Sequence, residues 1–198
     1  MKKFLSILMV FALIFASMLV FASCGGNGDG DNGDDGDSFE LGSVTEQPSG
    51  YKLYENNNVA FYYPASLTTS ENVQGNEGSV AVIDLMTGSS LSLTYGETEE
   101  GEEYEPMTLG KFESTFVAAL NAEGYEVSKY EELAPGVYRL EYDRGGGIII
   151  TQTMAFIYNS GVRVAGIATV TTSSAFETDP QVGSIFINSI RLFKKTVN

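Results

Sequence analysis

The residues that could do chemistry in this 198-residue chain are carboxylates, hydroxyls and a few lysines and arginines. The sequence contains no histidine and a single cysteine, Cys24. Without histidine, a Ser-His-Asp triad, a Cys-His dyad and a His-ligated zinc or iron site are impossible. Carboxylates could still serve a glycosidase-like acid pair or an oxygen-ligated metal, but no such pair stands out. We therefore predict no enzyme, no catalytic residue, no metal site and no cofactor, with a carboxylate-based hydrolase as the third hypothesis.

Glutamates gather in one predicted loop. They are Glu97, Glu99, Glu100, Glu102, Glu103 and Glu105. Their negative potential could dock a basic partner or collect cations, because such a field speeds encounter until salt screens it. A solvated loop is the plainer interpretation. The six residues are thus a candidate recognition loop. The sequence alone does not distinguish recognition from a solvated loop.

Aspartates dominate the segment between Cys24 and Gly50, which contains no lysine or arginine. Its acids are Asp29, Asp31, Asp34, Asp35, Asp37, Glu40 and Glu46. Low hydrophobicity with high net charge predicts a disordered spacer over residues 24–50. The G-x-G-x-x-G match at 28–33 lacks a preceding strand, and its aspartates would repel a pyrophosphate. An EF-hand loop started at Asp29 misplaces Gly33 and Asp34, which leaves only loose calcium association open.

Cys24 directly follows an apolar leader. Lys2 and Lys3 precede an uncharged run from 4 to 22, and small residues close it as at a processing site, so residues 1–23 read as a signal peptide. The sequence Val-Phe-Ala-Ser-Cys at 20–24 resembles the lipobox of bacterial lipoproteins. That resemblance implies that Cys24 receives diacylglycerol and becomes the acylated amino terminus. We expect anchoring at the extracytoplasmic face of the cell membrane, without a membrane-spanning segment in the mature chain.

The net charge of the chain excludes some partners. It is −15 at pH 7, and removal of Lys2 and Lys3 makes the mature chain still more acidic. Nucleic-acid binding requires the opposite sign. Adhesion to anionic lipid is equally disfavoured, so the acyl anchor has to hold the protein at the membrane.

From Tyr51 onward, aromatic and β-branched residues predict a single monomeric domain over 51–198. Alternating or continuous apolar runs bounded by turn residues predict strands at 51–55, 59–63, 79–86, 91–95, 125–133, 137–144, 148–158 and 162–170. Helical spacing of Leu109, Phe112, Phe116 and Leu120 predicts a helix capped by Thr108 and stopped by Gly124. Asp179 and Pro180 begin a second helix.

Several strands are apolar on both faces and are joined by tight turns. We therefore predict an α+β fold, in which a mainly antiparallel sheet is covered by helices on both faces as an α/β/α sandwich. Seven tyrosines could line a ligand cleft or fill half-buried strand positions. They are Tyr51, Tyr54, Tyr62, Tyr63, Tyr95, Tyr138 and Tyr142. The glycines at 145–147 precede a strand and predict a turn rather than a phosphate cradle.

Over residues 51–193 the chain resembles the domain shared by PsbP, Mog1 and bacterial DcrB-like lipoproteins. The resemblance rests on YENNNVAFYYPASL, on the hairpin series from VYRLEYDR to VAGIATV, and on the closing PQVGSIFINSIRLF. It implies the same α/β/α sandwich. Members serve as photosystem accessory subunits, nuclear-transport cofactors or surface lipoproteins. No functional residue carries over, because these uses share no motif here.

The leading hypothesis is a lipid-anchored, extracytoplasmic binding or accessory module that contacts a protein or envelope component. The alternative is a surface lipoprotein that binds a small ligand or a cation such as calcium. A calcium-dependent rise in the melting temperature would favour the alternative.

Overall fold

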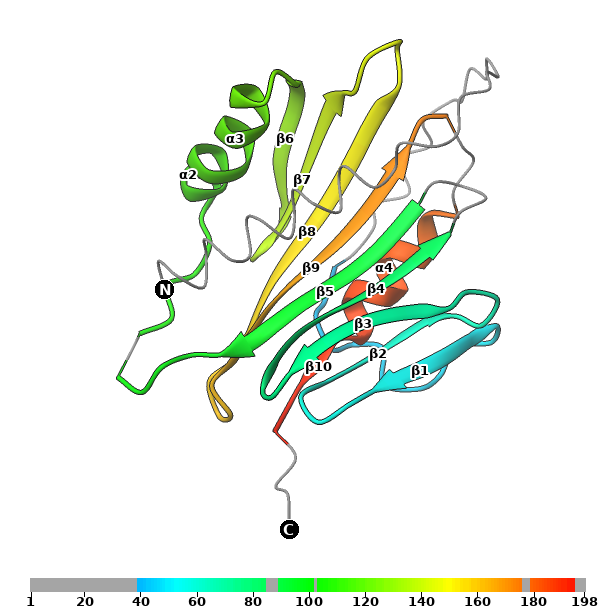
Figure 1. Cartoon of the computed structure of the whole chain (residues 1–198), viewed down its shortest axis with the longest axis vertical. Helices are drawn as coiled ribbons and strands as arrows, with labels where there is room; N and C mark the ends of the chain where they lie inside the picture. Colours follow the sequence, from blue (N-terminus) through cyan, green and yellow to red (C-terminus); the bar gives the residue numbers. More distant parts are fainter. Residues whose placement is uncertain (1–38, 85–88, 102, 176–178, 195–198) are drawn as a thin grey trace.

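A seven-stranded sheet forms the larger layer of the structure, which is a computed structural model describing residues 39–84, 89–101, 103–175 and 179–194. Its strands follow the order β3-β4-β5-β9-β8-β7-β6, and every neighbouring pair runs antiparallel (Figure 1). The strands are β3 (Thr69–Gln74), β4 (Glu77–Asp84), β5 (Ser89–Glu97), β6 (Glu126–Ala134), β7 (Val137–Asp143), β8 (Ile149–Asn159) and β9 (Val164–Ser173). Leader residues 1–23 and Cys24 lie outside the described ranges.

A second, three-stranded sheet packs on one face of the first. It has the order β1-β2-β10 and consists of β1 (Tyr51–Glu55), β2 (Val59–Pro64) and β10 (Arg191–Leu192). Asn56 forms the turn between β1 and β2, where its Oδ1 accepts hydrogen bonds from the backbone N–H groups of Asn58 and Val59. Strand β2 is buried from Val59 to Tyr63.

Two helical segments accompany the sheets in the described ranges. The first is continuous over α2 (Leu109–Phe112), the π-helical turn η1 (Glu113–Val117) and α3 (Ala118–Ala122); the second is α4 (Pro180–Ser189). Thr108 caps the first and Asp179 caps the second, each through its side-chain oxygen. Neither described helix is long and apolar enough to cross a membrane.

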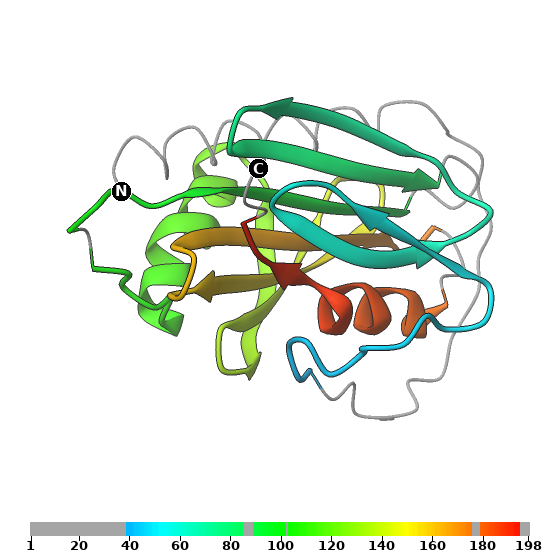
Figure 2. The same cartoon turned by 90° about the horizontal axis from the view of Figure 1, so that it is seen from below.

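The large sheet has two differently covered faces. On the α4 face, Leu91, Leu93 and Tyr95 of β5 join a core with Phe186 of α4 and Phe61 of β2. Figure 2 shows α4, β2 and β10 side by side over this face. The covering layer is therefore a small sheet together with one helix.

On the opposite face, here called the α3 face, the first helical segment covers only part of the sheet. Phe112, Val117 and Leu120 pack against strand residues of β6, β7 and β8 and against Ile167 of β9. The strand residues in this core are Val127, Tyr130, Tyr138, Leu140, Tyr142, Ile150, Met154 and Phe156. Phe112 stacks on Tyr138 with ring centroids 4.9 Å apart.

The prediction of an α/β/α sandwich with helices on both faces is wrong. The chain is mostly antiparallel strand in two sheets, with little helix. Apolar residues on both faces of a strand predict that both faces are covered, but they do not predict whether a helix or a second sheet covers them. Here β2 and β10 share with α4 the cover that the prediction assigned to helices alone.

Residues 39–50, which belong to the predicted spacer, contact the domain along α4. Phe39 packs against the α4-face core. The N–H of Glu40 donates to Asn188 Oδ1 at 2.9 Å, and the N–H of Val44 donates to the Asn188 carbonyl at 3.2 Å. Tyr62 Oη donates to the carbonyl of Thr45 at 3.4 Å. This segment therefore lies against the end of α4 and against β2.

Candidate functional site

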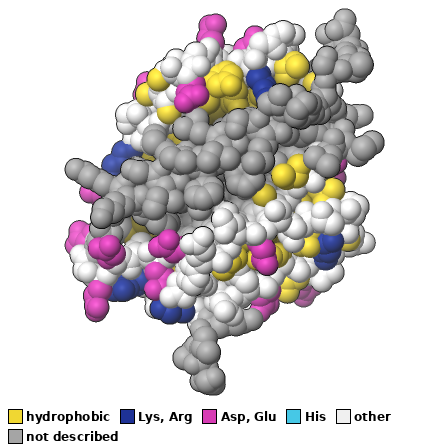
Figure 3. All heavy atoms as spheres, in the orientation of Figure 1, with side chains coloured by type: hydrophobic (Ala, Val, Ile, Leu, Met, Phe, Trp, Pro, Cys, Tyr) yellow, Lys and Arg dark blue, Asp and Glu magenta, His cyan; other side chains and the backbone are white. Residues whose placement is uncertain are grey.

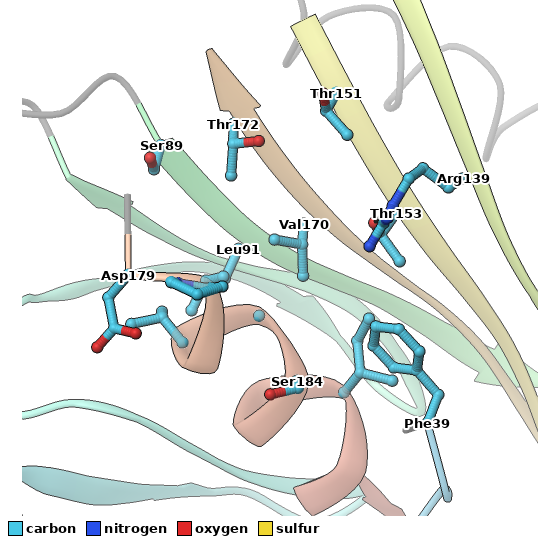
Figure 4. Close-up of a pocket in the computed structure, with 14 residues that line it drawn as sticks. Phe39, Ser89, Leu91, Arg139, Thr151, Thr153, Val170, Thr172, Asp179 and Ser184 are labelled. Carbon is cyan, nitrogen blue, oxygen red and sulfur yellow. Dashed lines mark hydrogen bonds between the residues drawn. The ribbon is translucent and has the colours of Figure 1, made fainter. Parts of the chain in front are cut away.

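A pocket of about 200 Å³ lies between the beginning of α4 and the α4 face of the large sheet (Figure 4). Strands β5, β7, β8 and β9 form its floor, and the first turns of α4 form its roof. The lining residues are Phe39, Ser89, Leu91, Arg139, Thr151, Thr153, Val170, Thr172, Asp179, Pro180, Val182, Gly183, Ser184 and Ile187.

Strand register places the floor residues in rows across the sheet. Arg139 of β7 pairs with Thr153 of β8, which pairs with Val170 of β9, which pairs with Leu91 of β5. Because directly paired residues of antiparallel strands point to the same face, the row runs from a cation through a hydroxyl to two apolar side chains. In the next row Thr151 pairs with Thr172. The first row is thus polar toward β7 and apolar toward β5, whereas Thr151, Thr172 and Ser89 add hydroxyl groups to the rest of the floor.

The roof approaches the sheet closely at Gly183. A Cβ at this position would lie 3.0 Å from Val170 Cγ1, so a larger residue would push α4 away from β9. Asp179 Oδ1 accepts the N–H of Gln181 at 2.9 Å and fixes the start of the helix, with Pro180 at its first position. These two features hold the roof at a defined height above the floor.

Two charged side chains belong to the described lining of the pocket, Arg139 and Asp179. Figure 4 shows the Arg139 side chain extending toward Thr153, and its Nε lies 3.5 Å from Thr153 Oγ1. The Asp179 carboxylate points away from the strands in the same view. Arg139 is opposite Glu131 of β6, whose carboxylate pairs with Lys129 at 2.8 Å. The described lining therefore contains one basic and one acidic side chain.

The predicted recognition loop lies at the other end of β5. Glu97 pairs with Lys194 at 2.6 Å and Glu105 pairs with Lys111 at 2.6 Å; the hydrogen bond from Lys111 lowers the pKa of Glu105. Glu99, Glu100 and Glu103 are exposed, and Glu102 lies outside the described residues. Figure 3 shows acidic side chains gathered at the lower left, where this loop leaves β5 in Figure 1. The six glutamates are therefore not equivalent, because Glu97 and Glu105 form ion pairs with lysines.

Contacts on both sides hold the described part of this acidic loop against the domain. The N–H of Thr98 donates to the Arg163 carbonyl at 2.9 Å. Tyr104 stacks on Tyr158 with ring centroids 4.3 Å apart and an interplanar angle of 10°. Tyr138 Oη donates to the Met107 carbonyl at 2.8 Å. The loop is pinned where it leaves β5, in its middle, and just before α2.

The seven tyrosines singled out by the sequence do not form a cleft together. None of them belongs to the described lining of the pocket. Tyr62, Tyr63, Tyr95, Tyr138 and Tyr142 are buried, whereas Tyr51 and Tyr54 are half-buried. Tyr63 and Tyr95 belong to the α4-face core and Tyr54 packs against it, whereas Tyr138 and Tyr142 belong to the α3-face core.

Two of these tyrosines belong to a polar network between the sheets. Asn56 Nδ2 donates to Tyr54 Oη at 3.0 Å and to Tyr95 Oη at 2.7 Å, and Tyr54 Oη donates to a carboxylate oxygen of Glu71. Burial raises the pKa of Tyr54 and of Tyr95. Both phenols therefore remain protonated and serve as structural hydrogen-bonding groups.

The described residues offer no group of three or more Cys, Asp or Glu side chains placed to hold a metal ion. The aspartates at 29–37 lie outside the described ranges, so the calcium alternative stays a prediction. The glycines at 145–147 all have positive φ and form an exposed turn between β7 and β8. Gly145 N–H donates to Asp143 Oδ1 at 2.6 Å, which matches the predicted turn.

Sequence reasoning missed the pocket. The alternation of Arg139 with Tyr138 and Leu140 indicated that the arginine faces away from one core. It did not indicate which side chains lie across from Arg139 on β8 and β9, or that α4 roofs them. That information depends on pairings between strands distant in sequence.

Comparison with known proteins provides no identification: no family model matches the chain, and no curated protein matches it. What the protein binds is therefore inferred from the chemistry of the pocket and of the acidic loop.

Proposed function

We propose that the protein is a binding module, held at the extracytoplasmic face of a membrane by a lipid on Cys24, and that the pocket beneath α4 holds a small ligand. The observation that supports this proposal is the pocket itself. Its walls come from four adjacent strands and a capped helix, so its shape is preformed. Ligand sites characteristically combine an apolar surface with a few converging polar groups.

The pocket lining supports binding better than hydrolysis. A glycosidase-like mechanism needs two carboxyl groups, about 5 to 9.5 Å apart, on either side of the scissile bond. Asp179 is the single carboxylate in the lining that the structure describes, and its Oδ1 already caps α4. Threonine hydroxyls and a guanidinium can hold a ligand but do not supply an acid pair.

Spectra of 13C-labelled methyl groups test whether the pocket binds small molecules. Val170, Val182 and Ile187 line the pocket, whereas Leu120 and Ile150 lie in the other core and serve as internal controls. A panel of small acids, amines, amino acids and sugars is added at millimolar concentration. We expect at least one compound to shift the pocket methyls in a saturable way and to leave the controls in place. A panel that moves none of the pocket methyls contradicts the proposal.

A protein partner at the acidic loop is the second candidate function. It is favoured by the way the loop is held, because Glu99, Glu100 and Glu103 are presented on a segment fixed by Thr98 and Tyr104. Preordered charges lose less entropy on binding than charges on a free loop. Replacement of Glu99, Glu100, Glu102 and Glu103 by Gln should then remove a partner in envelope pull-downs.

The matched control replaces four exposed acids elsewhere, Glu46, Glu77, Glu123 and Glu126, by Gln. If both quadruple variants retain the same partners, the acidic loop is a solvated loop and the second candidate is wrong. If both lose them, net charge rather than the loop is responsible.

A further inference from the structure

We propose that Tyr104 and Tyr158 form an oxidative cross-linking site, at which a haem peroxidase supplied with hydrogen peroxide joins the two rings as dityrosine. The link fastens the acidic loop covalently to β8. This inference concerns a modification of the chain and does not depend on the pocket. It combines the geometry of the ring pair, the position of each residue in the fold, and the oxidisable side chains that the sequence contains.

The two rings lie face to face. Their centroids are 4.3 Å apart, and their planes are 10° from parallel. Carbon atoms of stacked rings are in van der Waals contact at about 3.5 to 4.0 Å, so the ortho carbons of one ring lie close to the other ring. Holding two reacting groups in contact converts an encounter between them into a step within one molecule, which is much faster. The stacked pair is therefore positioned for coupling before any oxidation occurs.

The two tyrosines belong to different kinds of element. Tyr158 is in β8, where it pairs with Ala165 of β9. Tyr104 lies in the acidic loop between β5 and α2, outside any helix or strand. A bond between ortho carbons requires the rings to slide from a stacked to an edge-to-edge arrangement, and a loop residue can make that adjustment while the strand residue keeps its place. Both side chains are only half-buried, so an electron and a proton can leave each ring toward solvent.

Few side chains of this chain compete with tyrosine for a one-electron oxidant. The sequence contains eleven tyrosines and no tryptophan, and its single cysteine, Cys24, is the residue proposed to carry the lipid. The six methionines are oxidised to sulfoxides, which form no bond to another side chain. Extracytoplasmic compartments are oxidising. One-electron oxidation at the proposed location therefore falls on tyrosine.

The reaction balances with peroxide as the electron acceptor. Burial raises the pKa of Tyr104, so its phenol is protonated and loses a proton together with the electron. Each phenol gives up one electron and one proton, and the two phenoxyl radicals form a bond between their ortho carbons. The hydrogen on each of these carbons then moves to the oxygen of its ring, which restores both phenols. Hydrogen peroxide takes up the two electrons and the two protons and becomes two molecules of water.

Tyr125 and Tyr142 provide an internal control. They are the other tyrosine pair with rings in contact among the described residues, with centroids 5.3 Å apart and planes at 59°. Tyr142 is buried in the α3-face core at 4% exposure, so its ring has no room to slide. Oxidation should therefore link the stacked pair and leave the tilted pair unlinked.

The experiment oxidises the mature chain, extracted with its anchor in detergent, with a haem peroxidase and hydrogen peroxide, and digests it with trypsin. The tryptic peptides separate the four tyrosines: Tyr104 is in 53–111, Tyr125 in 112–129, Tyr142 in 140–144 and Tyr158 in 145–163. We expect a covalent pair of peptides 53–111 and 145–163, lighter than their sum by two hydrogen atoms. Tandem mass spectrometry should place the bond at Tyr104 and Tyr158. A covalent pair of peptides 112–129 and 140–144 should be absent.

Phenylalanine variants test each ring, because phenylalanine keeps the stacked ring but has no hydroxyl to oxidise. Tyr104→Phe and Tyr158→Phe should each abolish the linked peptides, whereas Tyr125→Phe should leave them unchanged. The link also closes a long loop of chain, so oxidation should raise the urea midpoint of the wild type relative to Tyr104→Phe treated in the same way.

Four results overturn the inference. The link joins Tyr104 or Tyr158 to some other tyrosine, or the linked peptides persist in Tyr104→Phe, or the oxidised protein contains no dityrosine, or the link forms only between two molecules. The first, third and fourth results are read on the unaltered protein.

Discussion

Gly78 of β4 is the glycine at which one added methyl group should lower the free energy of unfolding most. It is paired with Tyr95 of β5, whose side chain is buried between the two sheets at 1% exposure. A Cβ on residue 78 would lie 2.7 Å from Tyr95 Oη and 3.0 Å from its Cζ, with the Asn72 carbonyl oxygen 3.1 Å away. The methyl group therefore has a rigid ring and backbone as its nearest neighbours.

We expect Gly78→Ala to lower the free energy of unfolding by about 2 to 4 kcal/mol. Overpacking of a filled core costs about 1 to 3 kcal/mol. Displacement of the Tyr95 ring also disturbs the hydrogen bond from Asn56 Nδ2, at 2.7 Å, which adds about 1 kcal/mol. Urea unfolding followed by far-UV circular dichroism measures the difference, provided that the m-value is unchanged.

Two further variants make the reasoning about Gly78 refutable. Gly110→Ala is the matched control: residue 110 is helical, has no atom within 4 Å of its added Cβ, and should be neutral or more stable by up to about 1 kcal/mol. In a Tyr95→Phe background the nearest clashing atom is absent, so Gly78→Ala should cost at least about 1 kcal/mol less. A cost below about 0.5 kcal/mol, or the same cost in both backgrounds, would refute the steric account.

Three other variants test the anchor, a buried phenol and the amino-terminal segment. Cys24→Ala should leave the membrane fraction or accumulate as an uncut precursor; processing and sedimentation like the wild type would contradict the lipid anchor. Burial, with Glu132 nearby, raises the pKa of Tyr138 from 10.0 to about 12, so the folded state keeps a proton that the unfolded chain has lost. Stability should therefore fall as the pH rises through this interval. Tyr138→Phe should make the urea midpoint less dependent on pH there; the same pH dependence in the variant and the wild type would contradict a raised pKa of Tyr138. Asn188→Ala removes the acceptor of the Glu40 N–H and should cost about 1 to 3 kcal/mol, with faster amide exchange at residues 40–44; unchanged exchange would mean that this bond does not hold the segment.

Local chemistry predicted the element boundaries of this domain well. The strands predicted at 51–55 and 59–63 flank the asparagine turn in the structure, where β2 extends to Pro64, and the side chain of Asn56 closes the turn. Thr108 and Asp179 cap their helices as predicted. These turns and helix caps depend on residues within a few positions of one another. Sequence patterns can predict interactions over that distance.

The layers and the candidate site depend on information that is not local. Strand β3 was missed because it is exposed and almost entirely polar, and it is held by its ladder to β4 rather than by burial. The prediction of one sheet did not include the second sheet of β1, β2 and β10, because continuous apolar residues indicate burial without indicating the neighbouring strand. Arg139 and Asp179 are 40 positions apart and share a pocket only because α4 returns to the sheet. The lipid anchor and the resemblance to PsbP-like domains stay predictions.

The position of β2 also sets an order for folding. Early in the chain, β2 gains β1 as a neighbour at once, but its other side is completed by β10, through the pairing of Ala60 with Arg191. The N–H of Tyr62 donates to Ser189 Oγ, and the Asn58 carbonyl accepts from the N–H of Phe193. Both hydrogen bonds therefore require residues near β10. Contacts that join sequence-distant residues form slowly because a long loop has to close first. We therefore expect the domain to remain open until β10 is available for pairing, and to depend until then on factors that shield its unpaired strands.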